Sequence, residues 1–157
     1  MKAKNQHQKK FLFWQQWLFY SSLLFAAYGL ILAFYSNNPL LAPYFELIAQ
    51  NFWNQPEFPD AVTDFKAFVL GPLGGSIAFC SILVAYIAKY PFKNKERWAR
   101  NAILVASLFW FITDSAVSLF YGAYLQGLVL NTLSLAIRLL PLLFTWKEFN
   151  ARPDRQA

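Results

Sequence analysis

Four long runs of apolar residues alternate along the chain with more polar segments. They extend from about residue 14 to 35, 68 to 88, 101 to 121 and 128 to 146. As an α-helix each run is roughly 30 Å long, which matches the hydrocarbon core of a membrane. Buried helices of a soluble protein are the alternative, but four of them in a chain of 157 residues would leave almost no polar surface. The pattern therefore predicts an all-α fold, an integral membrane four-helix bundle in which residues 1–157 form a single transmembrane domain.

The segment between the first two runs, residues 36–65, is too long for a simple connection. Apolar side chains recur in it at helical spacing, and Pro43 suits the first turn of a helix. We expect a short helix over Pro43–Trp53 that lies in the outer membrane interface, packs on the bundle as a lid, or does both.

Proline and glycine mark the other breaks in the pattern. The Gly71-Pro72 pair either starts the second span or kinks a longer helix. Residues 122–127, between the third and fourth runs, predict a tight turn, so these two runs should form an antiparallel hairpin. The polar tail of residues 150–157 is expected to be disordered.

Basic residues are concentrated on one side of the predicted bundle. The other side carries Lys66 among several acidic residues. By the positive-inside rule, the N and C termini and the turn between the second and third runs are cytoplasmic. The basic residues of that side are Lys2, Lys4, Lys9, Lys10, Lys89, Lys93, Lys95, Arg97, Arg100, Lys147, Arg152 and Arg155.

Composition excludes several classes of function. The net charge of +6 is divided among three short segments, so it forms no concentrated basic face and argues against nucleic-acid binding. The single cysteine, Cys80, excludes an intrachain disulfide and a cysteine metal site, and the single histidine, His7, excludes paired-histidine haem ligation and a Ser-His-Asp set. We therefore predict no catalytic residue, no metal site and no cofactor.

Small residues recur at helical spacing in the first two runs, and such stripes let helices approach closely in lipid. The stripe in the first run is Ser22, Ala26, Gly29 and Ala33. The stripe in the second run is Gly71, Gly75, Ala78 and Ala85. We interpret both as packing seams within the bundle, with a dimer face as the alternative.

Two charged residues lie deep in the predicted spans, Asp114 in the third and Arg138 in the fourth. Counted from the 122–127 turn at the rise of an α-helix, their depths differ by only about 4 Å. Side chains lean towards the N-terminus of their helix, so the two charged groups should converge. The sequence therefore predicts that Asp114 and Arg138 pair, directly or through water.

This pair has two interpretations. It is either a structural ion pair that fixes the hairpin register, with Asn131 and Ser118 satisfying the remaining bonding capacity, or part of a binding site. The binding site would be a polar pocket open to the outside, formed by Asp114, Arg138, Asn131, Ser118 and Ser134.

The stretch from Gly71 to Thr145 resembles known small membrane proteins. Its features are Gly71-Pro72-Leu73-Gly74-Gly75, a basic turn from Tyr90 to Trp98, and Trp110-Phe111-Ile112-Thr113-Asp114-Ser115 in the third run. It is similar to uncharacterised four-helix bacterial inner-membrane proteins, loosely of the DoxX-like kind. The resemblance covers about half the chain and implies a multi-pass protein of the bacterial cytoplasmic membrane, with no function or site residue carried over.

Two functions follow from these features. The first is a non-enzymatic accessory or interaction subunit in contact with the lipid bilayer, within a homo-oligomer or a larger membrane complex. The alternative is a small transporter, or a protein that binds a small molecule or lipid, using the polar pocket around Asp114 and Arg138.

Overall fold

The computed structural model describes residues 2–150, with side chains described from Gln6 to Phe149. It contains the α-helices α1 (Lys2–Phe34), α2 (Ala42–Trp53), α3 (Asp60–Ile87), α4 (Arg97–Phe120) and α5 (Asn131–Asn150). Between them lie a 3-10 turn, η1 (Pro39–Leu41), and two π-helical turns, η2 (Ala88–Phe92) and η3 (Leu125–Leu130). The described residues include no β-strand, so the all-α prediction is confirmed.

Four helical segments are long and apolar enough to cross a membrane: Gln6–Phe34, Asp60–Phe92, Arg97–Phe120 and Leu125–Phe149. They match the four predicted runs: the second and fourth contain theirs, and the first and third begin earlier but end one residue sooner. The second is longer because α3 continues through Pro72, so the longer helix is the correct one of the two alternatives. The expected disorder of residues 150–157 concerns mostly residues outside the described part, since Asn150 closes α5 and the rest follow it.

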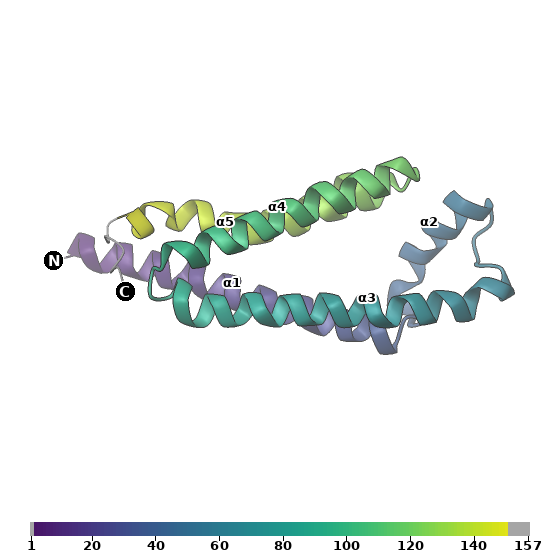
Figure 1. Cartoon of the computed structure of the whole chain (residues 1–157), viewed down its shortest axis with the longest axis horizontal. Helices are drawn as coiled ribbons and strands as arrows, with labels where there is room; N and C mark the ends of the chain where they lie inside the picture. The colour runs from purple at the N-terminus through teal and green to yellow at the C-terminus, as the bar shows by residue number, and fades with distance from the viewer. Residues whose placement is uncertain (1, 151–157) are drawn as a thin grey trace.

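The helices form two antiparallel hairpins, α1 with α3 and α4 with α5 (Figure 1). The hairpins meet near the end of the molecule where both termini lie, which we call the terminal end, and they diverge towards the opposite end, the divergent end. Trp14 stacks on Phe144 with 4.6 Å between ring centroids, and the Trp17 Nε1 donates to the carbonyl oxygen of Ile137 at 3.2 Å. These contacts join α1 to α5.

The seam between α1 and α3 depends on two glycines. A Cβ atom on Gly29 would lie 2.6 Å from the carbonyl oxygen of Gly74, and one on Gly74 would collide with Gly29 in return. Ser22, Ala26 and Gly29 are buried as predicted, and Ala33 is partly buried, with its backbone against Gly74. The seam of α3 instead consists of Gly74, Ala78, Ser81 and Ala85.

The predicted α3 stripe was therefore wrong in its first two members, because Gly75 is exposed and Gly71 is only partly buried. The correct residues have the same i, i+4, i+7, i+11 spacing as the α1 stripe. Both helices thus present the same periodic row of small side chains, which is what allows two backbones to approach closely along several turns.

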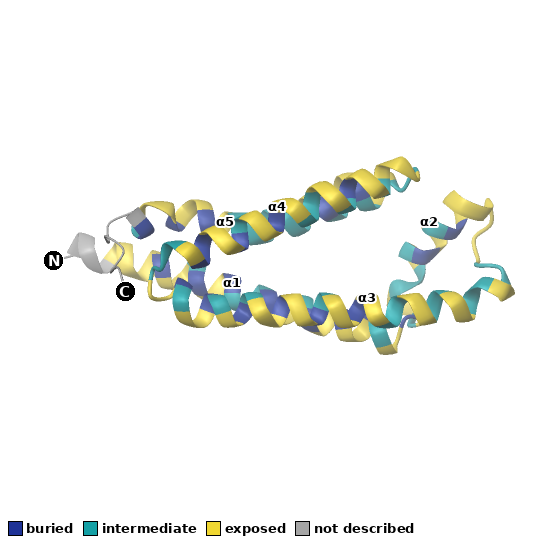
Figure 2. Ribbon diagram, in the orientation of Figure 1, coloured by how far each residue is buried: buried dark blue, intermediate teal, exposed yellow. Residues whose placement is uncertain are grey.

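The terminal end holds a continuous apolar core. Phe92 packs between Phe11, 6.0 Å away by ring centroid, and Phe149, 4.8 Å away, so three helical segments meet at one aromatic cluster. Leu18, Ile103 and further residues extend this cluster. Figure 2 shows that exposed residues dominate the outward sides of α3 and α4, which is expected for helices that face lipid.

Helix α2 connects the two hairpins at the divergent end and confirms the helix predicted over Pro43–Trp53. Phe45 is buried and packs edge-on against Phe58 with 6.1 Å between ring centroids, which holds α2 to the segment leading into α3. On its other side, Asn51 Nδ2 donates to the carbonyl oxygen of Tyr121 at 2.8 Å. The α2 helix therefore spans the distance between the hairpins where their own contacts have ended.

Candidate functional site

The α4–α5 hairpin turns over Gly122 and Ala123. Gly122 has a φ of +74°, a conformation that glycine adopts without steric strain. The predicted loop over residues 122–127 is therefore too long, since η3 already begins at Leu125. Gly127 is buried within the returning helix, where a Cβ atom would lie 3.1 Å from Cγ of Leu119. The close packing of Gly127 on Leu119 keeps the turn short.

Asp114 lies in a network of side-chain amides just below this turn. Asn131 Nδ2 donates to Oδ2 of Asp114 at 2.6 Å and to Oγ of Ser115 at 3.0 Å. Gln126 Nε2 donates to Oδ1 of Asn131 at 2.9 Å and to Oδ2 of Asp114 at 3.3 Å. Asn131 is only 1% exposed, so it forms the centre of the network. Hydrogen bonds of this kind are retained in membrane helices because lipid offers no alternative partner.

The direct ion pair predicted between Asp114 and Arg138 is not formed; among the described residues the salt bridge joins Lys95 to Glu148. The physical reason is the register of the hairpin. Position 131 faces position 115, and position 146 faces position 100. Arg138 therefore faces α4 near position 108, roughly 9 Å along the helix from Asp114 rather than the 4 Å expected from a longer turn.

Arg138 instead lies between aromatic rings near the middle of its span. Its guanidinium carbon is 5.1 Å from the ring centroid of Phe25 on α1 and 5.8 Å from that of Trp110 on α4. Its Nε is buried and has no hydrogen-bond partner. Side chains of α1, α4 and α5 therefore meet at this residue.

A second group of side chains lies one helical turn closer to the divergent end. Tyr28 follows Phe25 by three positions on α1, and Asp114 follows Trp110 by four positions on α4, so each shares a face with a neighbour of Arg138. Tyr44 of α2 lies close to both. Burial, together with the nearby Tyr28 and Asp114, raises the pKa of Tyr44 to about 12. The Tyr44 hydroxyl therefore stays protonated at neutral pH.

We call the surface formed by Phe25, Tyr28, Trp110, Asp114 and Arg138 the inter-hairpin face. The other candidate residues differ from these. Ser118 and Ser134 are partly buried, and their hydroxyls make no hydrogen bond to the described residues. The structure therefore brings Asn131 together with Asp114 and places Arg138 about one helical turn closer to the terminal end. The two serines lie outside the amide network.

Sequence reasoning missed Gln126 and Ser115, which complete the amide network. Gln126 is the only side chain with an amide between the turn and Asn131, and Ser115 is adjacent to Asp114. Both signals were present in the chain. Gln126 was missed because residues 122–127 were predicted to form a loop instead of a helical segment that faces α4.

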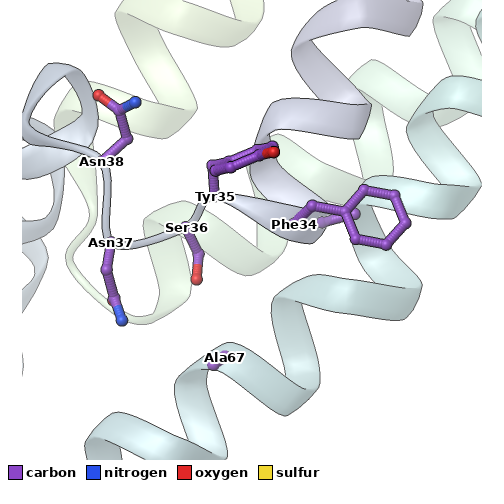
Figure 3. A pocket seen from close by; sticks show the side chains of 7 residues that line it. Phe34, Tyr35, Ser36, Asn37, Asn38 and Ala67 are labelled. Atoms are coloured by element: carbon purple, nitrogen blue, oxygen red, sulfur yellow. The ribbon is translucent and has the colours of Figure 1, made fainter.

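A shallow depression of about 400 Å³ lies elsewhere, at the end of α1 (Figure 3). Figure 3 shows the side chains of Asn37 and Asn38 pointing in opposite directions, and Phe34 and Tyr35 extending away from them. Its polar groups do not converge on one point, and it contains no carboxylate or basic side chain. This depression is therefore a weaker candidate than the inter-hairpin face.

Within residues 6–149, whose side chains the structure describes, no group of three or more His, Cys, Asp or Glu side chains is arranged to hold a metal ion. In comparisons with protein-family models, with curated proteins and with solved structures, the chain matches none of them. The function of the chain is therefore inferred from the chemistry of the inter-hairpin face.

Proposed function

We propose that this chain is a non-enzymatic membrane protein that binds an anionic group at Arg138. The observation that carries the proposal is the guanidinium of Arg138, which lies near the middle of a span with a buried Nε that has no hydrogen-bond partner. This is the binding function that the sequence offered as its alternative, with Arg138 as the centre of the site.

The free energy of an unpaired arginine at this depth supports the proposal. A central arginine costs about 2.5–3.5 kcal/mol to insert, even on the insertion scales that give the lowest values. The two aromatic neighbours return about 0.5–2 kcal/mol as cation–π interactions. If Arg138 had only a structural role, we would expect it to have a hydrogen-bonded partner, because a buried charge without a partner is costly. A bound anion would supply that partner.

The geometry of the guanidinium is suited to an anion. Whereas Nε is buried, Nη1 and Nη2 retain exposed surface, and neither makes a hydrogen bond to the described residues. Arginine presents its donors as a planar fork that matches carboxylate and phosphate oxygens. A carboxylate or phosphate could therefore bind the free side of the fork.

We further infer that the membrane is a bacterial cytoplasmic membrane with both termini on the cytoplasmic side. The distribution of basic residues supports this orientation, and the resemblance of Gly71 to Thr145 to small four-helix inner-membrane proteins supports the compartment. In this orientation the divergent end, with α2, faces the outside.

The test compares wild-type protein with Arg138→Met, using Lys93→Met as a control for loss of an exposed basic residue. Each protein is purified in mild detergent, and the bound small molecules and lipids are identified by mass spectrometry. We expect a molecule with a phosphate or carboxylate group that is enriched in the wild type and in Lys93→Met and is lost from Arg138→Met.

The same samples are unfolded in mixed micelles. Because Arg138→Met removes an unpaired charge, its free energy of unfolding should not fall. Equal amounts of bound anions in all three proteins, together with a destabilised Arg138→Met, would show that Arg138 is structural.

An accessory or interaction subunit is the second candidate, and the divergence of the hairpins favours it. Large apolar side chains such as Phe109 and Phe120 are 73% and 82% exposed, which leaves broad surfaces for a second copy or a larger membrane complex. A stoichiometric protein partner that remains bound to Arg138→Met would support this role independently of the anion site.

A further inference from the structure

The inter-hairpin face carries two charges of opposite sign, and neither has an ionic partner among the described residues. Asp114 and Trp110 are four positions apart on α4, and Trp110 is a neighbour of Arg138. Tyr28 and Phe25 are three positions apart on α1, and Phe25 is the other neighbour of Arg138. The carboxylate and the guanidinium therefore lie on the same face, and the carboxylate is about one helical turn closer to the divergent end.

Each charged group also has hydrogen-bonding atoms without a partner among the described residues. Both hydrogen bonds that Asp114 accepts go to Oδ2, while Oδ1 accepts none from the described residues and is not fully buried. Arg138 has Nη1 and Nη2 in the same condition. The amide network orients the carboxylate but leaves one oxygen available to a ligand.

The two charges are placed to hold one small molecule between them. Their helical positions are about 9 Å apart along the hairpin. Asp114 leans towards the terminal end and Arg138 towards the divergent end, because side chains lean towards the N-terminus of their helix. The charged groups are thus closer together than their backbones, at a spacing that a compact molecule with two charges can span.

The sign of the second charge restricts the ligand. A simple anion at Arg138 is repelled by Asp114, and a simple cation at Asp114 is repelled by Arg138. A zwitterion satisfies both residues and leaves the site neutral overall, which matters most where water is scarce. Tyr44 lies near the carboxylate, Trp110 precedes Asp114 by one turn on the same face of α4, and aromatic faces attract an ammonium group.

We propose, on the basis of the anion-binding function above, that the ligand of the inter-hairpin face is a zwitterion whose phosphate binds Arg138 and whose ammonium binds Asp114. This chemistry occurs in the phosphoethanolamine headgroup of a membrane lipid and in free phosphoethanolamine. Tyr44, carried by α2, closes the ammonium end of the site.

The test measures lipid binding to the wild-type protein by native mass spectrometry in mild detergent. The probes are phosphatidylethanolamine, which has an ammonium group, and phosphatidylglycerol, which has the phosphate alone, with identical acyl chains. We expect wild-type protein to bind phosphatidylethanolamine about tenfold more tightly, as one additional charge interaction at this depth implies. This comparison requires no variant, so it does not depend on whether a variant folds.

Two variants identify the groups responsible. Asp114→Asn should lower affinity for phosphatidylethanolamine until the two lipids bind alike, and Arg138→Met should lose both. The matched control is Glu46→Gln, which removes an acidic charge from an exposed position of α2 and should keep the tenfold preference.

The outcomes separate the two proposals. Equal or tighter binding of phosphatidylglycerol to the wild type overturns the zwitterion and leaves an anion site at Arg138. Unchanged binding of both lipids to Arg138→Met overturns the anion site itself. Competition by free phosphoethanolamine, with glycerol phosphate ineffective, identifies the headgroup alone as sufficient, whereas binding without such competition identifies the lipid as the source of the same chemistry.

Discussion

The two ends of the molecule are built on different principles. At the terminal end, aromatic rings from α1, η2 and α5 interlock, and Phe92 and Phe149 are fully buried. At the divergent end the hairpins separate, and their contacts depend on α2 and on single interactions such as the one between Asn51 and Tyr121. The terminal end is organised for packing, and the region beyond it presents polar and charged groups.

Two arginines show what this difference means for a charge. Arg100, at the terminal end, donates from Nε and Nη2 to Oδ1 of Asn101 at 3.1 and 2.9 Å and lies 3.8 Å from the ring centroid of Trp146. Nη1 of Arg100 is buried without a hydrogen-bond partner, as is Nε of Arg138. Arg138, however, makes no hydrogen bond to the described residues from any guanidinium nitrogen, and its nearest ring centroid is 5.1 Å away. The guanidinium of Arg100 is therefore held by two of its three nitrogens, and that of Arg138 by none.

The largest expected effect is the loss of an aromatic ring from the terminal end. Phe92→Ala should lower the free energy of unfolding by about 3–5 kcal/mol, because it leaves a cavity between Phe11 and Phe149. Unfolding in mixed micelles measures this change. The control is Phe79→Ala, which removes a ring that is 62% exposed and should change stability far less, since lipid contacts replace it. Equal losses for the two variants would contradict a packed terminal core.

The next largest effect should come from the glycine seam of α1 and α3. Gly74→Ala should lower the free energy of unfolding by about 1–3 kcal/mol, because the added Cβ collides with the Gly29 backbone. Gly75→Ala is a matched control one position along, where nothing lies within 4 Å of the added atom. If Gly75→Ala were the more damaging of the two, the seam described above would be on the wrong face of α3.

The amide network should contribute less. Asn131→Ala removes the hydrogen bonds to Asp114 and Ser115 and should lower the free energy of unfolding by about 1–2 kcal/mol. The neighbouring exposed residue provides the control, Thr132→Ala, which should have little effect. A double-mutant cycle with Asp114→Asn should show coupling between the two positions, and strict additivity would argue against the network.

The smallest effect should come from the ion pair of Lys95 and Glu148. The two side chains are 29% and 28% exposed and their charged atoms are 2.6 Å apart. Solvent screening limits such a pair to about 0.2–1 kcal/mol, which a cycle with Lys95→Met and Glu148→Gln would measure. Raising the salt concentration should reduce the coupling, and a salt-independent coupling above that range would mean that the terminal end excludes water more completely than its exposure indicates.

The long helices and the stripe of small residues on α1 could be predicted because each depends on local pattern. Runs of apolar residues of sufficient length predict spans whatever their neighbours, and Pro43 marked the start of α2 to within one residue. The stripe on α1 was correct for the same reason, since a helical period is a property of the sequence. The stripe predicted on α3 was wrong because Gly71, Gly74 and Gly75 are equally small. Only the position of α1 decides which of them lies in the seam.

The partner of Arg138 could not be predicted in this way. A turn shorter by three residues moves every facing position on α5, and the helical rise converts this into several ångströms between two charged groups. The sequence determined that Asp114 and Arg138 lie within the spans, because their depth follows from the run that contains each of them. Only the tertiary structure decided that Asn131 donates to the carboxylate of Asp114 and that Arg138 lies between Phe25 and Trp110. The physical reason is that the register of the helices and the divergence of the hairpins arise from contacts between segments far apart in the chain.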